Sequence, residues 1–206
     1  MEKPAPSDRP ILDLIRRRWS PRAFSNRPVP REILATLFEA GRWAPSCYNE
    51  QPWRYLVATG DDPAGLACAN DVLAAGNGWA HAAPVLVLSL ARMSFTHNGE
   101  PNPHAWHDVG AASSYIFLQA TQMGLYMHEM AGFDRERARE AYAIPAGWEP
   151  VAMIAIGYEG TVDALTEKQR AAERSERKRG PLAEMVGGAR FDAPFDLGGT
   201  SPARRP

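Results

Sequence analysis

Short polar side chains gather in one loop of this chain, between two segments of regular apolar spacing. The stretch covers residues 44–55: it begins where a helical pattern stops and ends in the strand-like run 54–58. It contains Pro45, Ser46, Asn49, Gln51 and Pro52. Carboxamide groups both donate and accept hydrogen bonds, which suits the edge of a flat heterocycle, while proline restricts the backbone. The pattern predicts a ligand-binding loop; a plain helix-to-strand connector with a buried Trp53 is the alternative.

Arginines crowd around a single hydroxyl group further upstream. Within residues 15–24, Arg18 and Arg22 flank Ser20. Guanidinium groups present planar, permanently charged donors that match phosphate in a bidentate manner. A phosphate site is one interpretation of this cluster. A solvated basic helix end is the other, because cations favour helix C-termini.

In this order and at this separation, the two stretches resemble the nitroreductase family of flavin enzymes. Residues 18–24 match an Arg-x-Ser-x-Arg-x-Phe element, and residues 45–53 match a Pro-Ser-x-x-Asn-x-Gln-Pro-Trp element. The resemblance covers about the first nine-tenths of the chain and is more specific than a lone glycine motif. It implies an FMN-dependent oxidoreductase with NADH or NADPH as the electron donor.

The composition is that of one ordinary domain. The 206 residues are 45% hydrophobic and 23% charged, with a formal net charge of -1. This balance points to neither a nucleic acid nor a membrane partner, and no apolar run has the length of a membrane span. Two cysteines make no disulfide framework and the N-terminus has no apolar signal core, so we expect a cytoplasmic protein.

The expected fold class is α+β. Helical and strand patterns do not alternate strictly, and no Gly-x-Gly-x-x-Gly follows a strand, which argues against a doubly wound dinucleotide fold. Strands are expected at 84–90 and 151–158, and Asp108 is expected to cap a helix that stops at Gly124. The resemblance implies a central, mostly antiparallel sheet flanked by helices. It also implies a homodimer with exchanged C-terminal segments and two flavin sites at its interface.

Three regions are expected along the chain. Residues 1–8 are rich in proline and charge and are expected to form a disordered lead-in. Residues 9–186 are expected to form a single nitroreductase-like domain. Residues 187–206 are expected to form an extended or disordered C-terminal arm.

The resemblance assigns the FMN phosphate to residues from both ends of the chain. The first group consists of Arg18, Trp19, Ser20 and Arg22. Trp19 stands where the family often has a second Arg, so only its backbone could serve. Arg177 and Arg179 match a basic-x-basic pair that reaches the same phosphate, although a solvated charge run is the alternative there.

A second set of contacts is implied for the flavin ring and ribityl chain. It consists of Pro45, Ser46, Asn49 and Gln51 from the polar loop, and of Met130, Ala131 and Gly132 from a later turn. The amides of Ala131 and Gly132 are expected near flavin N5 and O4, where fixed dipoles stabilise the electron density of the reduced ring. A plain turn with a helix cap is the alternative for residues 130–134.

The predicted reaction is a ping-pong transfer of hydride from NAD(P)H, through flavin N5, to a small acceptor. The resemblance implies nitroaromatics, quinones and similar electron-poor compounds as acceptors. No catalytic side chain is expected, because the cofactor carries the chemistry. The candidates for a substrate wall are Tyr48, Phe95, His104 and Trp106. All but Tyr48 lie in the long aperiodic segment 93–107, and such loops are usually functional.

Other functions fit parts of the sequence. A non-catalytic FMN-binding protein would carry the same motifs, and a relative with altered chemistry could perform reductive dehalogenation or flavin fragmentation. The near-neutral charge disfavours a nucleic-acid-binding module built on residues 16–22 and 177–179. A covalent role for Cys47 and a metal site at His104 and His107 are also disfavoured, since nothing activates the thiol and no third ligand follows.

Overall fold

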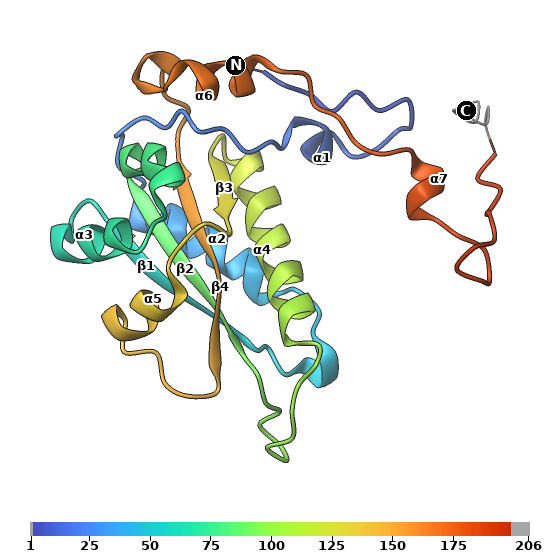
Figure 1. Ribbon diagram of the computed structural model, residues 1–206, viewed down its shortest axis with the longest axis horizontal. Coiled ribbons are helices and arrows are strands. Elements are labelled where there is room, and N and C mark those ends of the chain that lie inside the picture. Colours follow the sequence, from blue (N-terminus) through green and yellow to red (C-terminus); the bar gives the residue numbers. More distant parts are fainter. Residues whose placement is uncertain (1, 199–206) are drawn as a thin grey trace. The chain divides into compact units, whose positions relative to one another are not determined.

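A four-stranded antiparallel sheet organises the computed structural model, which describes residues 2–198 (Figure 1). The strand order is β1-β2-β4-β3, with β1 at Trp53–Thr59, β2 at Val85–Arg92, β3 at Tyr126–Met130 and β4 at Trp148–Gly157. Strand β2 is buried at almost every position, as its continuous apolar run predicts. Strand β3 is an edge strand, so its outer side is open to other segments or to a ligand.

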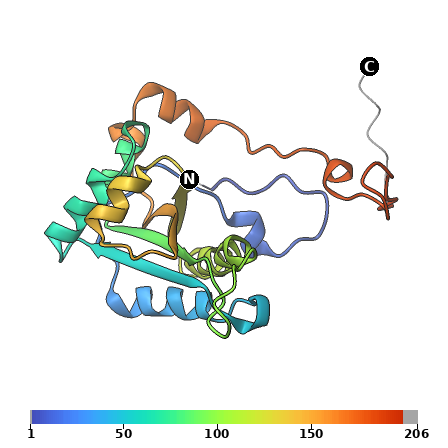
Figure 2. The ribbon, with the colours of Figure 1, turned by 60° about the horizontal axis from the view of Figure 1, so that its bottom comes forward.

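Helices cover both faces of the sheet, and buried apolar residues pack between the sheet and the helices on each face. Helices α2 (Arg31–Arg42) and α4 (Ala105–Gln122) pack on one face, around a core that includes Val87 and Ile154. Helices α3 (Pro63–Asp71) and α5 (Arg135–Ala141), with the 3-10 helix η2 (Ala75–Ala82), cover the other face. Figures 1 and 2 show these layers, and the α+β prediction is confirmed.

Several helix ends follow from local sequence. Asp62 and Asp134 accept hydrogen bonds from the amides of Gly65 (3.0 Å) and Arg137 (2.9 Å), so both acids act as N-caps. Gly124 follows α4 with a φ of 74°, as its predicted stop requires. The prediction for Asp108 was wrong, because α4 begins earlier, at Ala105, and the tertiary structure buries this carboxylate within the helix's first turns.

The chain divides into two units, Met1–Ser175 and Glu176–Pro206. The first includes α1 (Asp13–Arg17), the 3-10 helices η1 (Cys47–Asn49) and η3 (Val162–Ala164), and α6 (Glu167–Arg174). The second includes α7 (Leu182–Met185). The expected domain boundary after residue 186 falls inside the second unit. Residues 199–206 of the expected C-terminal arm lie outside the described residues.

Residues near the N-terminus make hydrogen bonds to other parts of the first unit. The Ala5 amide donates to the Arg16 carbonyl (2.7 Å), and Lys3 Nζ donates to the Glu173 carbonyl (2.7 Å). A charged side chain and a backbone amide thus find partners near both ends of this unit, and the disordered lead-in stays a prediction.

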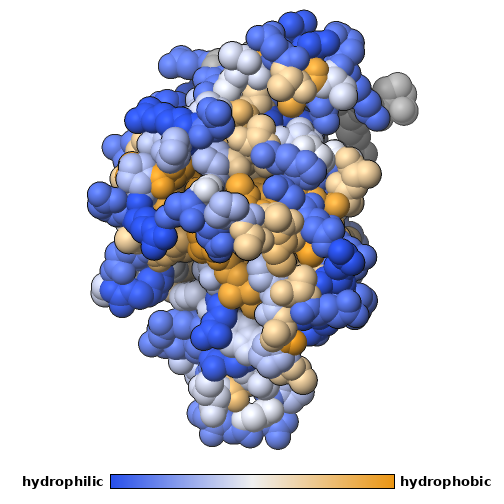
Figure 3. Space-filling view, turned by 90° about the vertical axis from the view of Figure 1, so that its left-hand side faces the viewer, coloured by the Kyte–Doolittle hydropathy of each residue, from blue (hydrophilic) through white to orange (hydrophobic). Residues whose placement is uncertain are grey.

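The surface is mostly hydrophilic on the side of α3 and α5, and apolar residues gather there in a central band (Figure 3). Partly buried hydrophobic side chains pack against the core of this face, among them Leu66 and Ile144. Between residues 2 and 198, no helix combines the length and apolarity that crossing a membrane requires.

Candidate functional site

The arginine–serine segment crosses the open edge of strand β3. The Arg18 guanidinium lies 5.2 Å from the centre of the Phe117 ring, on the α4 side of the sheet. The Arg22 guanidinium lies 6.0 Å from the centre of the Trp79 ring, on the opposite side. Arg18 Nη1 also donates to Ser20 Oγ (3.3 Å), which lies between the two arginines in sequence. The segment therefore presents cationic donors around the free edge of the sheet.

Trp19 is buried within this segment. Its ring meets Tyr126 of β3 edge to face, with 6.0 Å between the ring centres. Its indole Nε1 is buried and has no hydrogen-bond partner among the residues that the structure describes. An unpaired buried donor is unusual and leaves one hydrogen bond to be made by another group. Trp19 thus offers a side-chain donor here, where the sequence predicted only a backbone contact.

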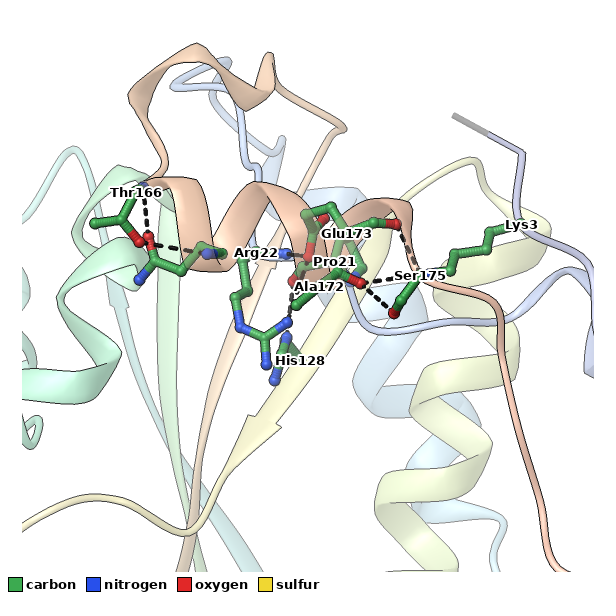
Figure 4. A network of polar contacts seen from close by, with 9 residues as sticks. Lys3, Pro21, Arg22, His128, Thr166, Ala172, Glu173 and Ser175 are labelled. Carbon is green, nitrogen blue, oxygen red and sulfur yellow. Dashed lines mark hydrogen bonds and ion pairs between the residues drawn. The ribbon is translucent and has the colours of Figure 1, made fainter.

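His128 holds the segment to β3. Its Nδ1 lies 2.8 Å from the Pro21 carbonyl oxygen, so Nδ1 carries a proton and donates it (Figure 4). Burial, followed by the charges of Arg22 and Arg18, lowers the pKa of His128 to about 4. The imidazole is therefore neutral at pH 7, and it fixes the position of the backbone next to Arg22.

The turn after β3 keeps two backbone amides available. Asn77 Nδ2 and the Ala74 amide both donate to the Gly132 carbonyl, at 2.8 and 3.1 Å. A Cβ atom at position 132 would lie 2.7 Å from Asn77 Nδ2, so glycine permits this close approach. The amides of Ala131 and Gly132 donate no hydrogen bond within the described chain. Met130, the first residue of the predicted turn, is buried at the end of β3.

The polar loop is held in a strained conformation by its own side chains. Tyr48, Asn49 and Gln51 have φ angles of 52°, 55° and 50°, in the left-handed region. The Gln51 amide donates to Ser46 Oγ (3.0 Å), and Gln51 Nε2 donates to the Asn49 carbonyl (3.1 Å). Left-handed backbone at non-glycine residues is costly and persists where the surroundings dictate it, often at ligand sites. Pro45, which precedes this turn, is exposed.

Two acidic residues anchor this loop, a role that the sequence analysis predicted for neither of them. Asp108 of α4 accepts the Cys47 amide at 2.9 Å. The buried Glu50 carboxylate accepts from Arg92 and from the Thr96 amide, both at 2.7 Å. Burial opposes ionisation of Glu50, but the Thr96 hydrogen bonds and the Arg92 charge outweigh it and lower its pKa. The sequence did offer a signal for Glu50, because this acid lies between Asn49 and Gln51, two predicted ligands of the flavin.

One chain presents the predicted contacts as two groups. Asp108 anchors the polar loop at the start of α4, whereas Phe117, under Arg18, follows nine positions later. Nine residues of α-helix rise about 13 Å. In the sheet, the loop leads into β1 at one edge and the Gly132 turn follows β3 at the other. The arginine segment and the Gly132 turn therefore share one edge of the sheet, and the polar loop lies toward the other.

Two of the four predicted substrate-wall residues are neighbours. The Tyr48 ring lies edge-on to Phe95, with 5.8 Å between centres, and His97 completes the cluster at 5.9 Å from Tyr48. Tyr48 is 81% exposed. His104 and Trp106 lie at the start of α4, and no ring contact joins them to this cluster in the described chain. His97 was missed because the segment 93–107 is aperiodic, so its pattern does not predict which of its side chains meets Tyr48.

Arg177 and Arg179 belong to the second unit. Arg179 Nη1 donates to the Lys178 carbonyl there (2.8 Å). Partial burial, and then the Arg179 charge, lowers the pKa of Arg177. Two like charges close together favour an anion nearby, which is consistent with the predicted phosphate contact. That contact stays a prediction.

Comparisons with known proteins agree with this architecture. The family model "Nitroreductase family" matches residues 15–75 and 63–158. A Thermus thermophilus "NADH dehydrogenase" is 28% identical over 183 residues, covering 72% of this chain and 88% of that protein.

Two solved structures share the fold over most of its length. The structure of an "oxidoreductase containing FMN" aligns with a TM-score of 0.86 and 35% identity, over 92% of this chain and 96% of its own. A Desulfovibrio desulfuricans protein, solved in complex with FMN, aligns with a TM-score of 0.64 and 25% identity, over 90% and 99%. The family match spans most of the first unit, including both motifs and the whole sheet. The chain belongs to the nitroreductase family.

Proposed function

We propose that this protein is an FMN-dependent oxidoreductase that uses NADH or NADPH as donor and reduces nitroaromatics, quinones or similar electron-poor acceptors. The observation that carries the proposal is the edge of β3: the segment with Arg18, Ser20 and Arg22 is held along this strand, and the available amides of Ala131 and Gly132 follow its end. The proposal is supported by the FMN-containing oxidoreductase whose structure aligns with 92% of this chain at 35% sequence identity.

The donors at this edge fit the cofactor's chemistry. A flavin phosphate carries close to two negative charges and asks for donors that need not lose a proton, which guanidinium and hydroxyl groups supply. Trp19 Nε1 is a buried donor without a partner in the described chain, and a phosphate or ribityl oxygen would satisfy it. The amides of Ala131 and Gly132 suit the polar edge of the ring.

Hydride transfer from NAD(P)H to the acceptor, through flavin N5, is the chemistry that bound FMN supplies. The protein's own part is to bind FMN and to orient the electron donor and the acceptor against it. Rigid amide dipoles after β3 stabilise negative charge without reorganising. The exposed ring of Tyr48 and the half-buried ring of Phe95 offer apolar area on which an aromatic acceptor can stack. The nicotinamide donor and the electron acceptor bind at this surface one after the other, which makes the kinetics ping-pong.

We further propose that the working unit is a homodimer. The polar loop and the arginine segment lie toward opposite edges of one sheet, and a two-fold partner brings the loop of one chain to the arginine segment of the other. Exchange of the C-terminal segments would then bring Arg177 and Arg179 to the same phosphate.

The visible spectrum of the purified protein, followed by stopped-flow mixing, tests this function. We expect flavin absorption that bleaches on anaerobic mixing with NADH or NADPH and returns on adding a quinone or a nitroaromatic. Bound flavin that neither donor bleaches would identify a non-catalytic FMN-binding protein. A protein that binds no FMN even when it is added in excess would refute the proposal altogether.

A further inference from the structure

Glu173 is a buried carboxylate whose hydrogen bonds all go to one residue. Its side chain is 2% exposed and lies near the end of α6. Glu173 Oε1 accepts from the Arg22 amide (3.1 Å) and from Arg22 Nη1 (3.4 Å) (Figure 4). Among the described residues, no other group donates to this carboxylate. Burying a carboxylate is costly unless it is paired, so its pairing with Arg22 alone calls for an explanation.

The peptide bond between Pro21 and Arg22 is held from both sides. The Pro21 carbonyl accepts from His128 of β3 at 2.8 Å, and the Arg22 amide donates to Glu173 of α6. A peptide unit is planar, so fixing its oxygen and its N–H fixes the orientation of the whole plane. The two contacts come from elements far apart in sequence, and together they set the direction in which the Arg22 side chain leaves the backbone.

The guanidinium of Arg22 keeps donors for a ligand. Only Nη1 meets Glu173, at a distance longer than the 2.7–2.9 Å typical of a charge-assisted bond. In the described chain, Nε and Nη2 of Arg22 have no hydrogen-bond partner, and the side chain is 33% exposed. Glu173 therefore holds Nη1 of the Arg22 guanidinium and leaves Nε and Nη2 available to a ligand.

Anchoring of the α6 end is a separate function, performed by other groups. Lys3 Nζ donates to the carbonyls of Glu173 (2.7 Å) and Ala172 (3.3 Å), and Ser175 Oγ donates to Ala172 (2.8 Å). These bonds satisfy terminal helix carbonyls. They use the backbone of Glu173 and leave its carboxylate to Arg22.

We propose that Glu173 is a positioning residue for flavin binding: it fixes the Pro21–Arg22 peptide and the Arg22 fork so that the open donors of Arg22 face the bound FMN. This inference rests on the proposed FMN function and adds a residue from outside both family motifs. Glu173 acts through Arg22 and does not itself touch the cofactor.

A double-mutant cycle on FMN affinity tests this proposal, with flavin fluorescence quenching as the readout. Glu173→Gln keeps the shape but removes the charge, so Arg22 would donate to a neutral amide oxygen in place of a carboxylate. We expect the Kd for FMN to rise about tenfold, because the hydrogen bonds that position Arg22 lose their charge assistance. In an Arg22→Ala background, the same change should alter the Kd less than about twofold, because the group it positions is gone.

Glu167→Gln is the matched control, since this acid is exposed on the same helix and pairs with Arg170 (3.1 Å); we expect no change in Kd. Glu173→Asp, which keeps the charge but withdraws it by one methylene, is the second variant if Glu173→Gln does not fold. An unchanged Kd in Glu173 variants of a protein that binds FMN would overturn the inference alone. So would an equal loss in the Arg22→Ala background, which indicates a general structural role. A wild-type protein that binds no FMN would instead refute the proposed function, and the inference with it.

Discussion

Neutral His128 is the residue that ties the arginine segment to the sheet at physiological pH. Its imidazole donates to Pro21 at 2.8 Å and packs 4.5 Å from the centre of the Trp79 ring. Arg18 and Arg22 lie near enough to disfavour a second positive charge there. A charged imidazole would meet both arginines across a poorly solvated region, so protonation should weaken the segment that carries the predicted phosphate contacts.

We expect this histidine to make the apoprotein less stable as the pH falls from about 6.5 to about 4. In that window the unfolded chain binds a proton at His128 and the folded chain, with a pKa of about 4, does not. Stability is therefore fully present above the ordinary histidine pKa and declines below it, by about 1–3 kcal/mol. The free energy of unfolding, measured with urea at several pH values, reports this loss.

His128→Gln supplies the comparison, because its amide can still donate to Pro21 but does not titrate. The difference between wild type and variant should change across the same pH window. Two parallel curves would show that His128 is not the titrating group.

At the scale of elements, α2 and α4 approach closely because Gly41 has no side chain. A Cβ atom at this position would lie 2.7 Å from Cγ1 and 2.9 Å from Cδ1 of Ile116. This contact sets the distance between α2 and α4. Helix α4 also carries Asp108, which binds the polar loop, and Phe117, which packs against Arg18. A change in helix spacing would thus reach both predicted binding groups.

We expect Gly41→Ala to destabilise the protein by roughly 1 kcal/mol. Overpacking against Ile116 costs about 1–3 kcal/mol, and the better helix propensity of alanine returns up to about 1 kcal/mol. In an Ile116→Ala background the clash disappears, and Gly41→Ala should become stabilising. Urea unfolding of the four proteins in this cycle measures the change of sign.

Gly110→Ala is the control within α4, since a Cβ there meets nothing within 4 Å. We expect this change to be neutral or stabilising. If Gly41→Ala destabilises equally with and without the Ile116 side chain, helix spacing does not depend on this contact.

For the whole molecule, the question is whether one chain can complete the site. The arginine segment lies at the β3 edge of the sheet, while the polar loop precedes β1 at the opposite edge. The proposed homodimer assigns the two groups of one flavin site to different chains. A heterodimer made from two differently disabled chains distinguishes this arrangement from a site within one chain.

We expect Arg18→Ala and Asn49→Ala homodimers each to bind FMN poorly. A purified heterodimer of the two variants should bind about half the FMN of wild type, because two-fold symmetry puts both defects into one site and leaves the other intact. The measurement is FMN content per dimer, with two affinity tags to isolate the mixed species.

The control is a heterodimer of Arg18→Ala with Ser20→Ala, both from the arginine segment. In that pair each site keeps one defect, so no binding should return. If the Arg18→Ala and Asn49→Ala heterodimer also fails to bind FMN, both groups belong to the same chain and the shared site is refuted.

The sequence by itself determined the fold class, the main elements and the two motifs. The local signals were Gly124 as a helix stop and the apolar run of β2, and Asp62 and Asp134 cap their helices through equally local contacts. These depend on neighbours within a few positions, where backbone preference and side-chain capping decide the outcome. The Arg-x-Ser-x-Arg and Pro-Ser-x-x-Asn-x-Gln-Pro-Trp stretches indicated the family, which is confirmed.

Only the tertiary structure decided how the motifs are held. Asp108 looked like a helix cap, yet it is buried and accepts the Cys47 amide 61 positions away. Glu173 lies in a polar helix whose pattern predicts exposure, yet it meets Arg22 across 151 positions. Long-range pairs such as these arise when the sheet order and the helix packing bring distant segments together, and no local periodicity encodes that distance.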